Sequence, residues 1–257
     1  MKARQTQRLQ AQAHWILLVL ILVIWQSACG LFDVSEFLFP SPSRIAQQFW
    51  EHHTTILGHA WRTWWVTMLG FGISIVVGVL LGCLMGSSRL AYDAMYPLMT
   101  AFNALPKAAF VPILVVWFGI GVGPAVLTAF LISFFPIMVN IATGLATLEP
   151  ELEDVLRVLG ARRTDVLLKV GLPRSMPYFF GALKVSITLA FVGTTVSEMT
   201  ASNEGIGYLL ISAGSSMQMG LAFAGLLVVG AMAMAMYELF ARLERRLTGW
   251  AHRGGDS

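Results

Sequence analysis

Charged residues are scarce in this sequence. Only 12% of its 257 residues are Asp, Glu, Lys or Arg, whereas 56% are hydrophobic and the mean hydropathy is +0.71. An ordinary soluble domain carries about 25% charged residues, so we do not expect a mostly water-exposed surface. The net charge of +3 comes from basic residues that lie between apolar runs. They form no clustered, aromatic-interleaved face, which argues against a nucleic-acid partner.

Cysteine and histidine are also rare. Cys29 and Cys83 both lie inside apolar runs, which indicates neither a disulfide framework nor a metal-ligand cluster. The five histidines lie at expected interfaces or in the tails, and no Ser/His/Asp arrangement can be assembled. The phosphate-cradling pattern G-x-x-x-x-G-K-[ST] is missing too. We therefore expect that this chain is not an enzyme and binds no metal and no cofactor.

Long apolar runs are what the sequence has in abundance. A bilayer core of about 30 Å is crossed by about 20 helical residues, and lipid offers backbone groups no outside partner. The alternation typical of a β-barrel is missing. The sequence thus predicts an all-α, polytopic membrane protein with about six transmembrane helices, at residues 15–31, 64–85, 97–118, 122–143, 178–198 and 219–243. A membrane domain of residues 15–247 would be flanked by tails at 1–14 and 248–257.

The first run follows Lys2, Arg4 and Arg8, as a signal peptide would. Gln26 stands three residues before Cys29, where a lipoprotein cleavage site usually carries an aliphatic residue. We interpret this run as an uncleaved first helix.

Basic residues fall mainly on one side of the predicted spans. If the N-terminus is inside, 13 of the 17 Lys and Arg residues lie in or beside cytoplasmic segments, and only Arg44 and Arg62 lie outside. The remaining two, Lys107 and Lys184, lie within spans and are left out of this comparison. Loops rich in Lys and Arg stay in the cytoplasm. The bias predicts a multi-pass protein of a bacterial cytoplasmic (inner) membrane with both termini in the cytoplasm.

The second span carries small residues at every fourth position: Gly70, Ser74, Gly78, Gly82 and Gly86. This spacing places them on one stripe of a helix. Such stripes let two helix backbones approach closely. We favour packing within the bundle over the alternative, a lining for a solute path.

Residues 149–173, between the fourth and fifth spans, form the longest charged stretch of the chain. Pro150 suits the first turn of a helix, and Gly160 suits its end. A second short helix is predicted from Thr164 to Val170, closed by Pro173. The two helices would form an elbow with an apolar ridge, and such a ridge can dock in a groove of a soluble protein.

At these residues the sequence resembles the cytoplasmic coupling loop of ABC importer permeases. The family pattern is Glu-Ala-Ala, three residues, Gly, nine residues, Ile, one residue, Leu-Pro. Here the matching positions are Asp154-Val155-Leu156, Gly160, Val170 and Leu172-Pro173. The residues at 154–156 and 170 differ from those of the family pattern, but the spacing of the pattern is complete. The resemblance implies that the ATPase-coupling residues are Glu153, Asp154, Val155, Leu156, Arg157, Leu159, Gly160, Val170, Leu172 and Pro173.

Motifs along most of the chain resemble one group of these permeases, the importers of nitrate, sulfonates, taurine and pyrimidine-type precursors. They are Phe39-Pro40-Ser41-Pro42, Pro106-Lys107, Pro112, the Trp-Phe-Gly-Ile-Gly run at 117–121, Phe135-Pro136 and Ser197-Glu198-Met199.

The resemblance implies a type I ABC importer permease-like fold and a set of partners. Two copies of the permease would form the path, each seated on one of two ATPase subunits, which bind ATP and Mg. An extracytoplasmic solute-binding protein would deliver a small anion or a pyrimidine-type precursor. The rival hypothesis is a self-sufficient secondary transporter or channel. That class tends to show repeat symmetry with broken midplane helices, and no convincing repeat is present.

Polar residues inside the spans usually face an interior or a cavity. In the fifth span, Lys184 begins a helical stripe of such residues, although it can also snorkel toward the headgroups. Pro106 can break the third span beside Lys107, whose ammonium could satisfy freed carbonyls or meet a passing anion. Asn140 follows Pro136 in the fourth span, where packing is the default. The candidate translocation-path residues are Lys107, Asn140, Thr188, Phe191, Thr195 and Glu198.

Overall fold

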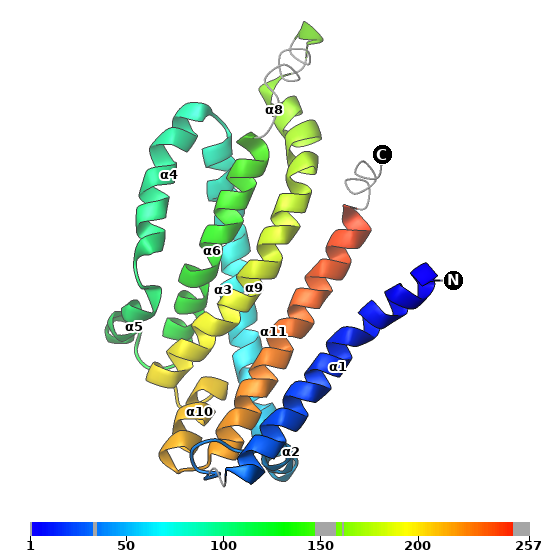
Figure 1. The fold of residues 1–257 in the computed structure, drawn as a ribbon. Helices are drawn as coiled ribbons and strands as arrows, with labels where there is room; N and C mark the ends of the chain where they lie inside the picture. Colours follow the sequence, from blue (N-terminus) through cyan, green and yellow to red (C-terminus); the bar gives the residue numbers. More distant parts are fainter. Residues whose placement is uncertain (1, 33–34, 147–157, 161, 249–257) are drawn as a thin grey trace.

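The computed structural model describes residues 2–32, 35–146, 158–160 and 162–248. In these ranges the chain is helical and contains no strand (Figure 1). The α-helices are α1 (Lys2–Leu31), α2 (Pro42–Glu51), α3 (His53–Gly86), α4 (Arg89–Ala104), α5 (Val111–Phe118), α6 (Val122–Ala146), α8 (Arg163–Val166), α9 (Leu172–Ala201), α10 (Ile206–Ser215) and α11 (Met219–Leu247).

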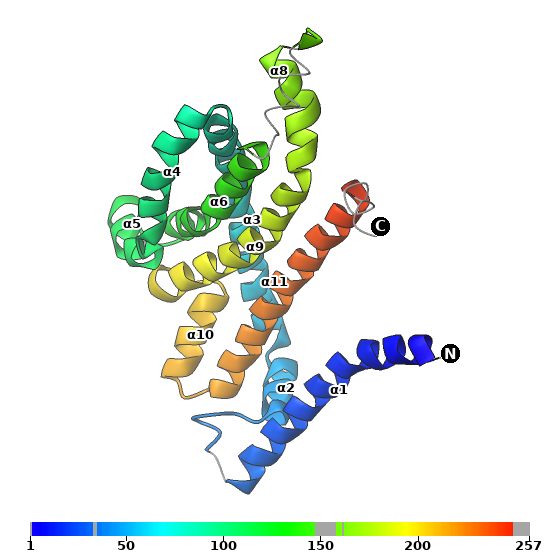
Figure 2. The same ribbon diagram turned by 45° about the horizontal axis from the view of Figure 1, so that its top comes forward.

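The core lies where α3, α6 and α9 pack side by side, with α11 against α9 (Figures 1 and 2). Its fully buried side chains include Ile137, Ile187 and Phe191. Small residues bring the backbones together. A Cβ atom built on Gly78 would lie 2.9 Å from Ile137 Cβ, and one on Gly193 would lie 3.0 Å from Ala129 Cα. The stripe on α3 is thus a packing surface against α6, as predicted.

The bundle has two distinct ends. The end of α11 and α8 lie at one end, which we call the tail end, whereas the start of α1 lies away from the bundle beside its middle (Figure 1). The helices α2 and α10 lie at the opposite end, which we call the α10 end. The end of α11 therefore lies toward α8, and α10 lies at the other end.

Four of the six predicted spans are confirmed as single helices long and apolar enough to cross a membrane: α3, α6, α9 and α11. The helix α1 runs from Lys2 to Leu31, and its apolar part, Ile16–Leu31, has nearly the bounds of the first predicted span, 15–31. Most of its large apolar side chains are exposed, and in Figure 2 the beginning of α1 diverges from the bundle. This exposed flank is suited to lipid.

The third predicted span, 97–118, is not one helix. The helix α4 begins earlier than predicted, at Arg89, and ends at Ala104. The chain then bends by 73° and continues through the 3₁₀ turn Lys107–Phe110 into α5. The bend falls at Leu105 and Pro106, because proline lacks the backbone N–H that would continue the helix. A break at Pro106 was expected, but its size was not.

The predicted helix from Thr164 to Val170 is present, but its predicted closure at Pro173 is wrong. The segment starts one residue earlier, at Arg163, and runs without interruption through the π-helical turn Leu167–Gly171 into α9. Pro173 lies in the first turn of α9, where its missing N–H costs little. The wider π turn preceding it absorbs the change in hydrogen-bond register. The described residues thus form one rod from α8 to the end of α9.

Candidate functional site

The described part of the coupling segment, residues 158–160 and 162–173, projects from the tail end (Figure 1). Val158 and Leu159 are 88% and 77% exposed, although both are apolar. Gly160 has a φ of +87°, a backbone conformation that L side chains rarely adopt, which fits its predicted place at a helix end. Glu153, Asp154, Val155, Leu156 and Arg157 lie outside the described residues.

The first turn of α8 is held by Asp165. Its carboxylate accepts a hydrogen bond of 3.3 Å from the backbone N–H of Arg162 and pairs at 3.0 Å with the ammonium of Lys169. The hydrogen bond from Lys169 lowers the pKa of the Asp165 carboxyl below its ordinary value. Asp165 therefore closes the start of the rod in the manner of a capping residue.

The remaining predicted coupling residues lie in the π turn or at the start of α9. Val170 is half-buried and Pro173 is exposed. Leu172 begins α9. Val166, just before the π turn, is buried.

Lys184 does not face an open path in this structure. Its ammonium forms an ion pair with the carboxylate of Glu244, which joins α9 to α11. Both side chains are largely buried, at 20% and 14% exposure. The sequence suggested that this lysine either snorkels toward the headgroups or faces a pore. Neither interpretation predicted its partner, Glu244, which is 60 positions away.

Three of the candidate path residues lie on the next turns of α9. Thr188 is half-buried and donates to the carbonyl of Val185 at 2.7 Å. Phe191 belongs to the core. Thr195 is buried, and its hydroxyl has no hydrogen-bond partner in the described part of the chain.

Glu198, near the end of α9, is 2% exposed and lies at the α10 end. Its carboxylate accepts hydrogen bonds from the Thr63 hydroxyl, at 2.8 and 3.0 Å, and from the backbone N–H of Gly207 at 3.0 Å. Thr63 also accepts from the N–H of Ile206 at 2.8 Å. Glu198 thus connects α3, α9 and the start of α10.

Lys107 and Asn140 each satisfy a carbonyl near a proline. The Lys107 ammonium donates to the carbonyl and to the side-chain oxygen of Asn103, at 2.6 and 2.7 Å, just past the break at Pro106. The Asn140 amide donates to the Pro136 carbonyl at 2.8 Å. Both contacts are local to their own segments, so the structure does not bring these two side chains together with Glu198.

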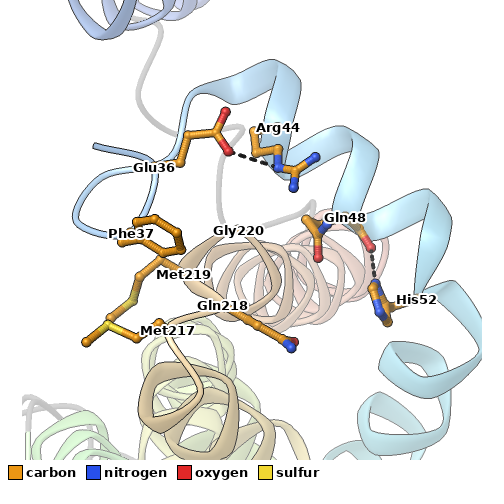
Figure 3. Close-up of a pocket in the computed structure, with 9 residues that line it drawn as sticks. All are labelled: Glu36, Phe37, Arg44, Gln48, His52, Met217, Gln218, Met219 and Gly220. Carbon is orange, nitrogen blue, oxygen red and sulfur yellow. Dashed lines mark hydrogen bonds and ion pairs between the residues drawn. The ribbon is translucent and has the colours of Figure 1, made fainter. Parts of the chain in front are cut away.

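A pocket of about 260 Å³ opens at the α10 end between α2, the segment before it and the start of α11 (Figure 3). Its lining includes an ion pair of 3.1 Å between Glu36 and Arg44, both partly exposed. The lining residues are Glu36, Phe37, Arg44, Gln48, His52, Met217, Gln218, Met219 and Gly220. Among the described residues, no three His, Cys, Asp or Glu side chains are arranged to hold a metal.

Sequence reasoning missed the partners of Glu198. His59 and Thr63 are four positions apart on α3, and Gly205 and Gly207 flank Ile206 at the start of α10. The Gly-x-Gly pattern is the one signal that marked a close backbone approach. Nothing local indicated which residue approaches it.

The comparisons with known proteins agree on one family. The model of the "binding-protein-dependent transport system inner membrane component" family matches residues 74–249. A probable ABC transporter permease protein of Haemophilus influenzae is 31% identical over 217 residues, covering 84% of this chain and 89% of that protein. The riboflavin transport system permease protein RibX of Chloroflexus aurantiacus is 31% identical over 237 residues, covering 91% and 88%. The taurine transport system permease protein TauC of Escherichia coli is 25% identical over 247 residues, covering 91% and 87%.

Among solved structures, a chain of the MetNI methionine ABC transporter matches with a TM-score of 0.67 and 17% sequence identity. The match covers 77% of this chain and 98% of the other. At this identity the likeness is one of fold.

Proposed function

Because this chain belongs to the family of binding-protein-dependent transport system inner membrane components, we propose that its coupling segment docks on an ATPase and that a second copy completes the solute path. The chain is a membrane-spanning permease subunit of an ABC importer and not an enzyme. Family membership decides against the rival hypothesis of a self-sufficient transporter or channel.

One observation carries the coupling proposal: the segment with the family spacing leaves the bundle at the tail end with apolar side chains facing outward. Val158 and Leu159 have no neighbour in the described chain that covers them. Exposed apolar side chains on a helix end are suited to a hydrophobic groove of a protein partner. The uninterrupted helix that follows them, from α8 into α9, is suited to carry a displacement of the coupling segment into the core.

The distribution of charge supports a cytoplasmic tail end. Described Lys and Arg residues accumulate there, although Lys169 pairs with Asp165, and Arg242 and Arg245 pair with Glu238. The positive-inside rule counts Lys and Arg rather than net charge, so it applies to such segments. At the α10 end, Arg44 and Arg62 are each paired with a carboxylate at 3.1 Å, from Glu36 and Glu204. The basic residues of the tail end are Arg89, Arg162, Lys169, Arg174, Arg242, Arg245 and Arg246.

A pair of exposed leucines tests the coupling proposal. Leu159 in the coupling segment and Leu90 at the start of α4 are 77% and 81% exposed, and both belong to the tail end. Leu159→Asp should reduce the amount of ATPase that co-purifies by at least about tenfold, because a buried carboxylate without a partner costs several kcal/mol and each 1.4 kcal/mol is about tenfold in affinity. Leu90→Asp, the control, should leave it unchanged. Equal ATPase recovery for both variants, with equal thermal stability, would refute the docking site.

The partners extend beyond the ATPase. We propose a homodimer of this chain on two ATPase subunits, which bind ATP and Mg, and an extracytoplasmic binding protein that delivers the solute; the family description supports the dependence on that binding protein. For the solute we propose a small anion of the nitrate, sulfonate or taurine type, or a pyrimidine-type precursor. The named solute of TauC, taurine, supports this range, whereas that of RibX, riboflavin, is a larger ring system outside it. Cross-linking of Cys-labelled chains tests the homodimer, and identification of the ligand that the binding protein retains tests the solute.

A further inference from the structure

The helix α10 does not cap its own N-terminus. The first N–H groups of a helix have no partner within it, and a Ser, Thr, Asp or Asn side chain usually supplies one. Here the N-cap residue is Gly205, which has no side chain and a φ of +97°. The donors are instead satisfied by other helices: Gly205 N–H donates to His59 Nδ1 at 3.0 Å, Ile206 N–H to Thr63 and Gly207 N–H to Glu198.

The same contacts fix Glu198. A buried carboxylate is costly unless it is hydrogen-bonded or paired. Within the described residues no Lys, Arg or His lies within ion-pair distance of it; the nearby Arg62 pairs with Glu204. The carboxylate is stabilised by the Thr63 hydroxyl and by the positive end of α10. Glu198 and the start of α10 therefore satisfy each other, with Thr63 between them.

Close packing prevents α10 from sliding along this junction. A Cβ atom on Gly205 would lie 2.2 Å from Glu198 Cδ, and one on Gly207 would lie 2.2 Å from the Thr195 carbonyl oxygen. Two glycines thus bring the α10 backbone directly onto α9. A shift of α10 relative to α9 would break the hydrogen bonds of Ile206 and Gly207.

The junction lies at the far end of the rod that begins in the coupling segment. From Arg163 to Ala201 the helix runs without interruption, a length of roughly 60 Å at 1.5 Å per residue. Asp165 holds its start at the tail end, and Glu198 is three residues from its finish at the α10 end. With ten residues, α10 cannot cross the bilayer and covers only this end of the bundle (Figures 1 and 2).

We propose that Glu198 and Thr63 are positioning residues for transport: they bind α10 to the end of the α9 rod, so that movement of the coupling segment displaces α10 and opens the solute path at the α10 end. The proposal rests on the coupling function proposed above. In this proposal α10 is the element that moves at the α10 end. It is connected to α9 by three hydrogen bonds, from Thr63 to Glu198, from Ile206 to Thr63 and from Gly207 to Glu198.

The test uses a matched pair at Thr63 in the complete complex with its ATPase. Thr63→Val keeps the shape of the side chain and removes the hydroxyl, whereas Thr63→Ser keeps the hydroxyl. Spin labels at Val192 on α9 and Ile211 on α10, both exposed, report the distance between the two helices after Cys29 and Cys83 are replaced by Ser. The distance is measured without nucleotide and with ATP and vanadate.

With serine at 63, one unchanged distance is expected in both nucleotide states, because α10 moves with α9. With valine, a second, longer distance should appear, and Glu198→Gln should give the same result through loss of the carboxylate. If Thr63→Val and Glu198→Gln both keep the single distance of the Ser variant, the junction does not position α10. Failure of the coupling proposal is distinguishable, since then the unsubstituted chain would not retain its ATPase, while the nucleotide-free distances would still differ between Val and Ser.

Discussion

A methyl group added at Gly82 is expected to push α3 away from α6. The Cβ atom of an alanine at this position would lie 2.7 Å from the Met138 carbonyl oxygen and 2.8 Å from Ile141 Cβ. Both neighbours belong to the backbone or to a β-branched side chain, so neither can rotate away. Ordinary contact at 3.4 Å requires the helices to part by roughly 0.7 Å at this point.

Overpacking of this kind costs about 1–3 kcal/mol. At about 2–4 °C per kcal/mol for a chain of this size, the thermal midpoint of Gly82→Ala should fall by roughly 2–12 °C. The control is Gly72→Ala on the same helix, where an added Cβ meets no atom within 4 Å. This substitution should leave the midpoint unchanged or raise it, because alanine favours the helix.

The assay is thermal unfolding of the purified chain in detergent, followed by the fraction that stays monodisperse after heating. Comparing the two Gly→Ala variants cancels the propensity gain that both share. A Gly82→Ala midpoint equal to or above that of Gly72→Ala would refute the close approach of α3 and α6 at this position.

Two ion pairs give further predictions. Lys184→Met should destabilise the chain by about 3–5 kcal/mol, because it leaves the carboxylate of Glu244 buried and unpaired. Lys184→Met combined with Glu244→Gln should recover most of that loss. A thermal midpoint that does not recover in the double variant would contradict the pairing. The pKa of Asp165 is lowered in the folded chain, so its contribution to the start of α8 should be present at neutral pH and should disappear as the pH falls through that lowered pKa. In a carbon-13 NMR titration of the carboxyl group, Lys169→Gln should raise the pKa of Asp165, and an unchanged titration would show that Lys169 is not its main partner.

The helices and the packing stripe could be predicted because their signals are periodic and local. Gly or Ser at every fourth position from Gly70 to Gly86 indicates one face of one helix, regardless of which neighbour that face contacts. The break at Pro106 follows from the missing N–H of proline. Hydropathy likewise predicted α3, α6, α9 and α11 as spans, whereas the bent third span shows where length alone misleads.

The candidate site was only partly predictable. Family spacing marked Gly160, and its positive φ fits that position. The same spacing suggested an elbow closed at Pro173, because proline usually ends a helix when it is read as an isolated residue. The π turn before Pro173 lets the helix continue. Such a local change in hydrogen-bond register could not be predicted from the hydrophobic periodicity of the sequence.

By itself, the sequence determined that this chain is a helical membrane protein with a charged segment of the ABC permease pattern, because hydropathy, charge bias and motif spacing are properties of neighbouring residues. Only the tertiary structure decided that Lys184 pairs with Glu244, that Glu198 is held by Thr63 and Gly207, and that α8 and α9 form one rod. These contacts join residues far apart in the chain or depend on a backbone donor freed at a helix end. Their partners exist only once the helices have packed.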